Sequence, residues 1–231
     1  MSKRPIILLN SNYVPGKWPM YEVPATYYQA ILEFGGLPVI TPSIGNNEDI
    51  LKLAELADGF CFTGADDYPP DFYGLKENNT MDIMQRERAI SDLILAKYAL
   101  NSDKPIIAIC AGHQLIHIAN GGQLIPHIHT DMKHTDEVYH EIKVSKNSRL
   151  EKIFGSNQIT INSYHHQAIN PDSISERFRI TAMAADGIVE AIENSDSQYI
   201  LSLQWHPERI KFPEHRAKIF TSFMDEVNKK R

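Results

Sequence analysis

Four short apolar runs in the first half of the chain constrain the fold most, because helical patterns separate them. We expect these runs to form strands over residues 5–9, 37–41, 59–63 and 105–109. Apolar spacing between and after them predicts helices over 25–34, 47–57, 82–100 and 112–119. Near-continuous apolar strands alternating with helices are typical of a parallel sheet covered on both faces.

The second half of the chain predicts strands of a different kind. They are expected over residues 140–144, 159–164, 178–184, 188–192 and 199–204. Asp186-Gly187 between two of them is a two-residue hairpin signal, so antiparallel strands are added to the parallel sheet. A last helix is expected over about 214–227. With 231 residues and neither a repeat nor a linker-like break, we expect one α/β domain over 1–231.

Composition excludes some classes of function. The net charge is -6, and the one basic cluster is Lys229-Lys230-Arg231, so no nucleic-acid partner is expected. No stretch approaches the roughly 18 apolar residues of a membrane span, so no membrane partner is expected. The first residues do not resemble a signal peptide, which favours the cytoplasm and two reduced thiols, Cys61 and Cys110.

Cys110 stands where the strand at 105–109 meets the helix at 112–119. The small residues Ala108, Ala111 and Gly112 allow the sharp turn of a nucleophile elbow there. A helix N-terminus lowers the pKa of a thiol and can hold an oxyanion. The alternative is a buried structural cysteine, which is the role we expect for Cys61 within its strand.

A thiol nucleophile needs a base, and the base needs a group that orients it. His206 and Glu208 follow the last apolar strand and lie two residues apart, so both can project toward the same side. We therefore predict a catalytic triad of Cys110, His206 and Glu208. The alternative is a surface histidine and glutamate at a helix entry.

These motifs resemble the class I glutamine amidotransferase-like superfamily and, within it, the gamma-glutamyl-gamma-aminobutyrate hydrolase family. Residues 62–67 resemble that family's Gly-Gly-x-Asp loop, 162–167 its Asn-Ser-x-His-His-Gln segment and 186–193 its Asp-Gly-x-x-Glu-Ala hairpin. The resemblance implies a flavodoxin-like three-layer sandwich with a mostly parallel central sheet. It also implies hydrolysis of a small γ-glutamyl amide through a thioester on Cys110.

The resemblance further implies an oxyanion hole built from backbone N–H groups of Gly64, Ala65 and Ala111. Two of these positions depart from the family. Ala65 stands where the family often has glycine, and Ala111 stands where it often has arginine. A backbone N–H survives both changes, so the departures concern specificity for the acceptor side of the substrate.

Four side chains are candidates for binding the substrate. Asp66 could bind the α-amino group or cap a turn, and Gln114 could touch the substrate or brace the elbow. His165 and His166 are expected on a strand, where neighbours face opposite sides, so one of them should reach the substrate. The group that binds the α-carboxylate stays open between Arg86, Arg88, the histidine pair and the backbone.

Ten histidines raise the question of a metal. His127, His129 and His134 could be ligands, but no cysteine partners them at the spacing of a zinc site. We therefore expect neither a metal nor a cofactor.

Three functions compete at this point. The first is a stand-alone hydrolase of γ-glutamyl amides, and the second is a glutaminase subunit that delivers ammonia to a partner synthetase. The third is a non-catalytic binding domain, since a fold does not fix a function. The complete triad favours an enzyme, and the substrate-side motifs favour the stand-alone hydrolase. The amine half of the substrate and the formation of a homo-oligomer stay open.

Overall fold

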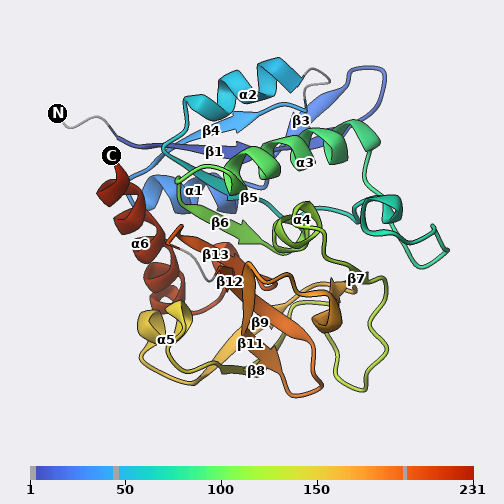
Figure 1. Ribbon diagram of the computed structural model, residues 1–231, viewed down its shortest axis with the longest axis vertical. Coiled ribbons are helices and arrows are strands. Elements are labelled where there is room, and N and C mark those ends of the chain that lie inside the picture. The colour runs from blue at the N-terminus through green and yellow to red at the C-terminus, as the bar shows by residue number, and fades with distance from the viewer. Residues whose placement is uncertain (1–3, 44–46, 195–196) are drawn as a thin grey trace.

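A nine-stranded sheet forms the centre of the computed structural model, which describes residues 4–43, 47–194 and 197–231 (Figure 1). Its strand order is β4-β1-β5-β6-β13-β12-β11-β8-β9. The strands are β1 (Ile6–Asn10), β4 (Leu37–Thr41), β5 (Gly59–Phe62), β6 (Ile106–Ile109), β8 (Val138–Val144), β9 (Gln158–Ser163), β11 (Phe178–Ala184), β12 (Val189–Asn194) and β13 (Ile200–Leu203).

Strands from the two halves of the chain meet at the pair β6–β13. On one side of this seam β4, β1, β5, β6 and β13 pair in parallel. On the other side β12, β11, β8 and β9 continue the sheet through antiparallel pairs. The mostly parallel sheet with added antiparallel strands is therefore confirmed.

Helices cover both faces of the sheet because successive strand residues alternate between two cores. Ile7 and Leu9 of β1 pack with α1, α5 and α6, whereas Leu8 packs with α2, α3 and α4. The helices are α1 (Ala25–Glu33), α2 (Asn47–Glu55), α3 (Arg86–Leu100), α4 (Ala111–Ala119), α5 (Arg149–Phe154) and α6 (Pro213–Lys230). This is the expected three-layer sandwich. None of the described helices is long and apolar enough to cross a membrane.

The sequence misplaces or misses several local elements. Helix α3 begins at Arg86 rather than at Asp82, because Asp67 holds the preceding segment through a bridge to Ile83 and a hydrogen bond from the Met84 N–H. The connection between β11 and β12 covers residues 185–188, longer than the expected two-residue turn, and Gly187 has a φ of 89°. The missed short elements are β2 (Asn12–Val14), β3 (Met20–Glu22), η1 (Pro70–Tyr73), β7 (Leu124–Ile125), α5, β10 (Ala168–Ile169), η2 (Pro171–Ser173) and η3 (Pro207–Arg209).

Candidate active site

Cys110 lies at a sharp turn between β6 and α4. Its φ of 54° and ψ of -110° are strained for a residue with a side chain, as a nucleophile elbow requires. Gly112 makes the turn possible, since a Cβ there would lie 2.4 Å from the carbonyl oxygen of Phe62. The thiol is 3.9 Å from the carbonyl oxygen of Tyr164. The other cysteine, Cys61, is in the core, and burial raises the pKa of its thiol.

The seam of the sheet brings His206 to Cys110. Leu203 at the end of β13 pairs with Ile109 at the end of β6, so the residues that follow both strands meet at one edge. His206 Nδ1 lies 2.8 Å from Glu208 Oε1. Among the described residues, Nε2 has no partner in good hydrogen-bond geometry, and the ring and the thiol line the same cavity.

The environment of His206 favours the charged imidazolium. Burial alone would lower the pKa of the ring, but the negative charge of Glu208, followed by that of the Cys110 thiolate, raises it to about 10. The hydrogen bond between Nδ1 and Glu208 adds to this effect. The arrangement can therefore hold an imidazolium beside Cys110 at neutral pH.

Tyr27 of α1 is a member of the site that the sequence did not indicate. Its hydroxyl accepts a hydrogen bond of 2.9 Å from the Gly64 N–H and lies 3.3 Å from His206 Nδ1. Burial, followed by the charges of Glu208 and Cys110, raises the pKa of Tyr27, so the phenol stays neutral. No motif marks this residue, because its helix shows only an ordinary buried face.

A cavity of about 580 Å³ opens over the thiol. All but one of the predicted site residues line it: Cys110, His206, Glu208, Gly64, Ala65, Asp66, Gln114, His165 and His166. The exception, Ala111, is buried at the first position of α4, directly after Cys110. Residues that the sequence did not single out complete the wall, including Tyr27, Asp67, Asp82, Tyr164 and Arg209.

Asp66 and Gln114 occupy this wall in different ways. Asp66, Asp67 and Asp82 all line the cavity, and burial, followed by the charge of Asp82, raises the pKa of Asp66. The side-chain amide of Gln114 donates to the carbonyl oxygen of Gln167 at 3.3 Å and to Gln204 Oε1 at 3.2 Å. Gln114 therefore braces the elbow as well as facing the cavity.

Both histidines of the 165–166 pair line the cavity, which corrects the expectation that only one would reach it. The strand β9 ends at Ser163, so the two residues lie in a loop and need not face opposite sides. His165 Nδ1 is 2.9 Å from the carbonyl oxygen of Gln167. His166 Nε2 is 3.0 Å from Asp67 Oδ1, and this contact raises the pKa of His166.

Neither arginine considered for the α-carboxylate lines the cavity. Arg86 pairs with Asp71 at 2.8 Å on the surface, and Arg88 is buried beside Asp92 at 3.2 Å. Arg209 lines the cavity instead. Its guanidinium lies 5.1 Å from the centre of the Tyr164 ring and pairs with Glu137 at 2.6 Å. The sequence could have indicated Arg209 as a site residue through its position directly after Glu208.

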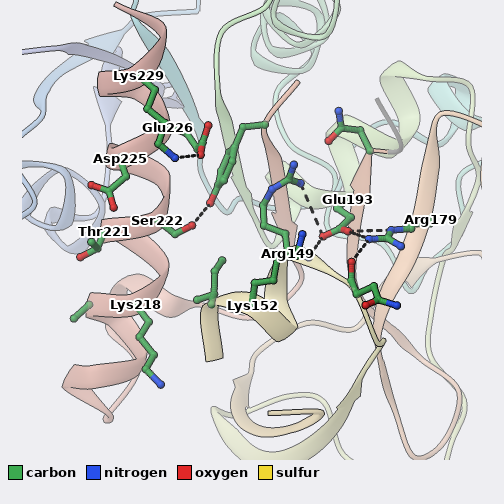
Figure 2. A pocket seen from close by; sticks show the side chains of 15 residues that line it. Arg149, Lys152, Arg179, Glu193, Lys218, Thr221, Ser222, Asp225, Glu226 and Lys229 are labelled. Atoms are coloured by element: carbon green, nitrogen blue, oxygen red, sulfur yellow. Dashed lines mark hydrogen bonds and ion pairs between the residues drawn. The ribbon is translucent and has the colours of Figure 1, made fainter. Parts of the chain in front are cut away.

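A larger groove of about 940 Å³ lies between α5, α6 and the antiparallel strands (Figure 2). Several of its charged side chains form ion pairs, as Figure 2 shows for Arg149 and Arg179 around Glu193. Among the described residues, its lining contains neither cysteine nor histidine. The cavity over Cys110 is therefore the candidate active site.

Known proteins resemble this chain over most of its length. The family model described as Peptidase C26 matches residues 10–208. A glutamine amidotransferase-like protein of Rickettsia prowazekii is 30% identical over 90% of this chain and 92% of its own length. The gamma-glutamyl-gamma-aminobutyrate hydrolase of Escherichia coli K12 is 29% identical over 79% of this chain and 76% of its own length.

Two solved structures share the fold. The glutaminase domain of a Trypanosoma brucei CTPS, solved with bound acivicin, has a TM-score of 0.68 and 18% identity, over 98% of this chain and 94% of that one. A glutamine amido transferase from Methylobacillus flagellatus has a TM-score of 0.59 and 15% identity, over 90% of this chain and 72% of that one. At these identities the likeness concerns the fold alone.

Proposed function

Because the chain belongs to the Peptidase C26 family, a glutamine amidotransferase-like hydrolase family, we propose that it cleaves γ-glutamyl amides through a thioester on Cys110. One observation carries the proposal. A strained cysteine at the start of α4 lies beside the buried His206–Glu208 pair, at the base of a cavity. The hydrolase named in Escherichia coli supports the choice of a γ-glutamyl substrate.

The proposed reaction has two steps. The Cys110 thiolate attacks the γ-carbonyl carbon, the C–N bond breaks, and the His206 imidazolium gives its proton to the departing amine. Neutral His206 then takes a proton from water, whose oxygen attacks the thioester carbonyl. The C–S bond breaks, and glutamate leaves with the thiolate restored. Glu208 holds the ring through Nδ1 in both steps.

We place the oxyanion hole at the backbone N–H groups of Gly64, Ala65 and Ala111. Gly64 and Ala65 line the cavity, and Ala111 N–H is at the positive end of the α4 dipole. The Gly64 N–H is already bound to the Tyr27 hydroxyl. The substrate oxygen must therefore share this donor or displace the phenol.

The cavity wall suggests how the glutamyl part binds. We propose that Asp66 pairs with the α-ammonium group and that Arg209, which also lines the cavity, pairs with the α-carboxylate. Gln114 and His166 then contact the remaining polar atoms of the substrate, whereas both ring nitrogens of His165, which also lines the cavity, face protein groups.

The experiment that tests the proposal compares purified protein with its Cys110→Ala variant on a panel of γ-glutamyl amines and on free glutamine. We expect the wild-type protein to release the amine and glutamate from at least one γ-glutamyl amine, and the variant to lose this activity. A covalent glutamyl adduct on Cys110, trapped by acid quench and found by mass spectrometry, would identify the thioester. Ammonia release from glutamine alone would contradict the assigned substrate class, and full activity of the variant would contradict the mechanism.

A further inference from the structure

Next to the active-site cavity, three histidines surround the carboxylate of Glu190. Glu190 is on β12, His140 on β8, His134 in the loop before β8, and His165 in the loop after β9. The side chain of Glu190 is fully buried, those of His134 and His165 are 2% exposed, and that of His140 is 9% exposed. A buried carboxylate requires compensation by cations or hydrogen-bond donors.

The contacts around Glu190 are too long to provide this compensation well. Its Oε1 lies 3.4 Å from His134 Nδ1 and 3.6 Å from both His140 Nε2 and His165 Nε2. Charge-assisted hydrogen bonds are about 2.7–2.9 Å long. Among the described residues, both carboxylate oxygens and the Nε2 atoms of His140 and His165 are buried without a hydrogen-bond partner.

The outer nitrogens of two of these rings are already bound. His134 Nε2 is 2.9 Å from Asp186 Oδ2, and His165 Nδ1 is 2.9 Å from the carbonyl oxygen of Gln167. Histidines that bind a metal usually donate their other N–H to a carboxylate or a backbone carbonyl in this way. In a neutral ring the inner nitrogen then presents its lone pair to Glu190. His134 Nδ1 has one other neighbour, the Ser163 hydroxyl at 3.3 Å.

We propose that His134 Nδ1, His165 Nε2 and Glu190 Oε1 bind a divalent transition metal, with zinc as the best fit. These ligand atoms lie within 4.8 Å of one another. In a tetrahedral zinc site, bonds of about 2.0–2.2 Å place the ligand atoms about 3.3–3.5 Å apart, close to the observed contacts with Glu190. Two imidazoles and a carboxylate in a buried site favour zinc over magnesium or calcium, which prefer oxygen ligands.

The metal would act on the shape of the cavity rather than on the thiol. The loop after β9 carries Tyr164, whose carbonyl oxygen contacts Cys110, and His165, which lines the cavity. A metal would tie this loop to the centre of the sheet through Glu190. The His127-Ile128-His129 segment does not take part, since His127 contacts His166 instead. This inference does not depend on the proposed function.

The test measures zinc and cobalt binding in full-length protein carrying Cys110→Ser, so that the active-site thiolate cannot bind the metal. We expect one zinc per chain by elemental analysis after dialysis, and with Co²⁺ the strong visible absorption of a tetrahedral site. Adding Glu190→Gln or His165→Ala should remove both signals. His129→Ala, which alters an exposed histidine, is the matched control and should retain both.

A second variant keeps the test decisive if the ligand variants unfold. Asp186→Asn leaves every proposed ligand in place and removes only the carboxylate behind His134, so it should weaken zinc binding about 10–100-fold. If folded Cys110→Ser protein binds neither zinc nor cobalt, the proposal is wrong. Loss of binding in His129→Ala would place the metal at the surface and would also overturn it.

Discussion

The hydroxyl of Tyr27 accepts a hydrogen bond of 2.9 Å from the Gly64 N–H, which brings α1 into contact with the proposed oxyanion hole. A Cβ at Gly64 would lie 2.7 Å from this hydroxyl and 3.0 Å from His206 Cε1. Two side chains of the site therefore leave no room for a larger residue at position 64, in addition to any requirement of the turn.

We expect Gly64→Ala to lower kcat/KM by about 10²-fold, since the added methyl group displaces Tyr27 and His206 from the oxyanion region. Combining it with Tyr27→Phe, which removes the nearest atom, should restore part of the loss. Steady-state kinetics of the two single variants and the double variant give the coupling between the positions. Additive losses would show that the Tyr27 hydroxyl is not the obstacle.

Because the backbone of Cys110 is strained, variants at this position can separate an effect on catalysis from an effect on stability. Cys110→Ala should reduce turnover by at least about 10³-fold while changing the melting temperature little. Cys110→Gly should be equally inactive but melt at a higher temperature than Cys110→Ala, because glycine adopts a φ of 54° without strain. Thermal denaturation followed by circular dichroism compares the two. A lower melting temperature for the glycine variant would contradict the strain.

Cys61 is the control for these variants, because it is a core residue. Cys61→Ala should retain activity and lower the free energy of unfolding by about 1 kcal/mol.

An alkylating reagent should label Cys110 first, and a γ-glutamyl substrate should slow this labelling. Inactivation that followed the labelling of Cys61 would exclude Cys110 as the nucleophile.

The pH dependence of His206 follows from its raised pKa. The folded value of about 10 lies above the ordinary 6.5, so proton binding stabilises the folded state fully below pH 6.5. This stabilisation is lost as the pH rises toward about 10. Glu208→Gln should lower the pKa of His206, which NMR titration of the ring measures. Glu137→Gln, which pairs with Arg209 instead, should leave it unchanged.

Asp66 is expected to act in substrate binding. Asp66→Asn should raise KM about tenfold with little change in kcat, because the pairing with the α-ammonium group exists before and during the reaction. Asp71→Asn, at a surface carboxylate outside the cavity, should change neither constant. A fall in kcat without a rise in KM would assign Asp66 a different role.

Local patterns were sufficient to predict the strands that lead to Cys110 and His206. Cys110 is at the meeting point of an apolar run and a helical pattern, and His206 follows the last apolar run. Parallel pairing of β6 with β13 then places the ends of these two strands side by side.

The remaining members of the site depend on tertiary contacts that no local pattern contains. Tyr27 reaches the site because α1 packs against η3, and its sequence neighbours show only a buried helix face. The orientation of His165 and His166 depends on where β9 ends, and its last residue, Ser163, lies one residue before the predicted end. Helix α5 had a readable signal, the capping box of Ser148 and Glu151, which the strand pattern around it obscured.

The pairing of β6 with β13 also has a consequence while the chain is being synthesised. Cys110 leaves the ribosome well before His206, and until β13 docks beside β6 the thiol has no imidazolium next to it. The proposed pairing of Cys110 with His206 is therefore assembled only when the last strand of the sheet is in place. An incomplete chain would carry Cys110 without its proposed base, which would limit the reaction of the thiol with oxidants and with acyl donors.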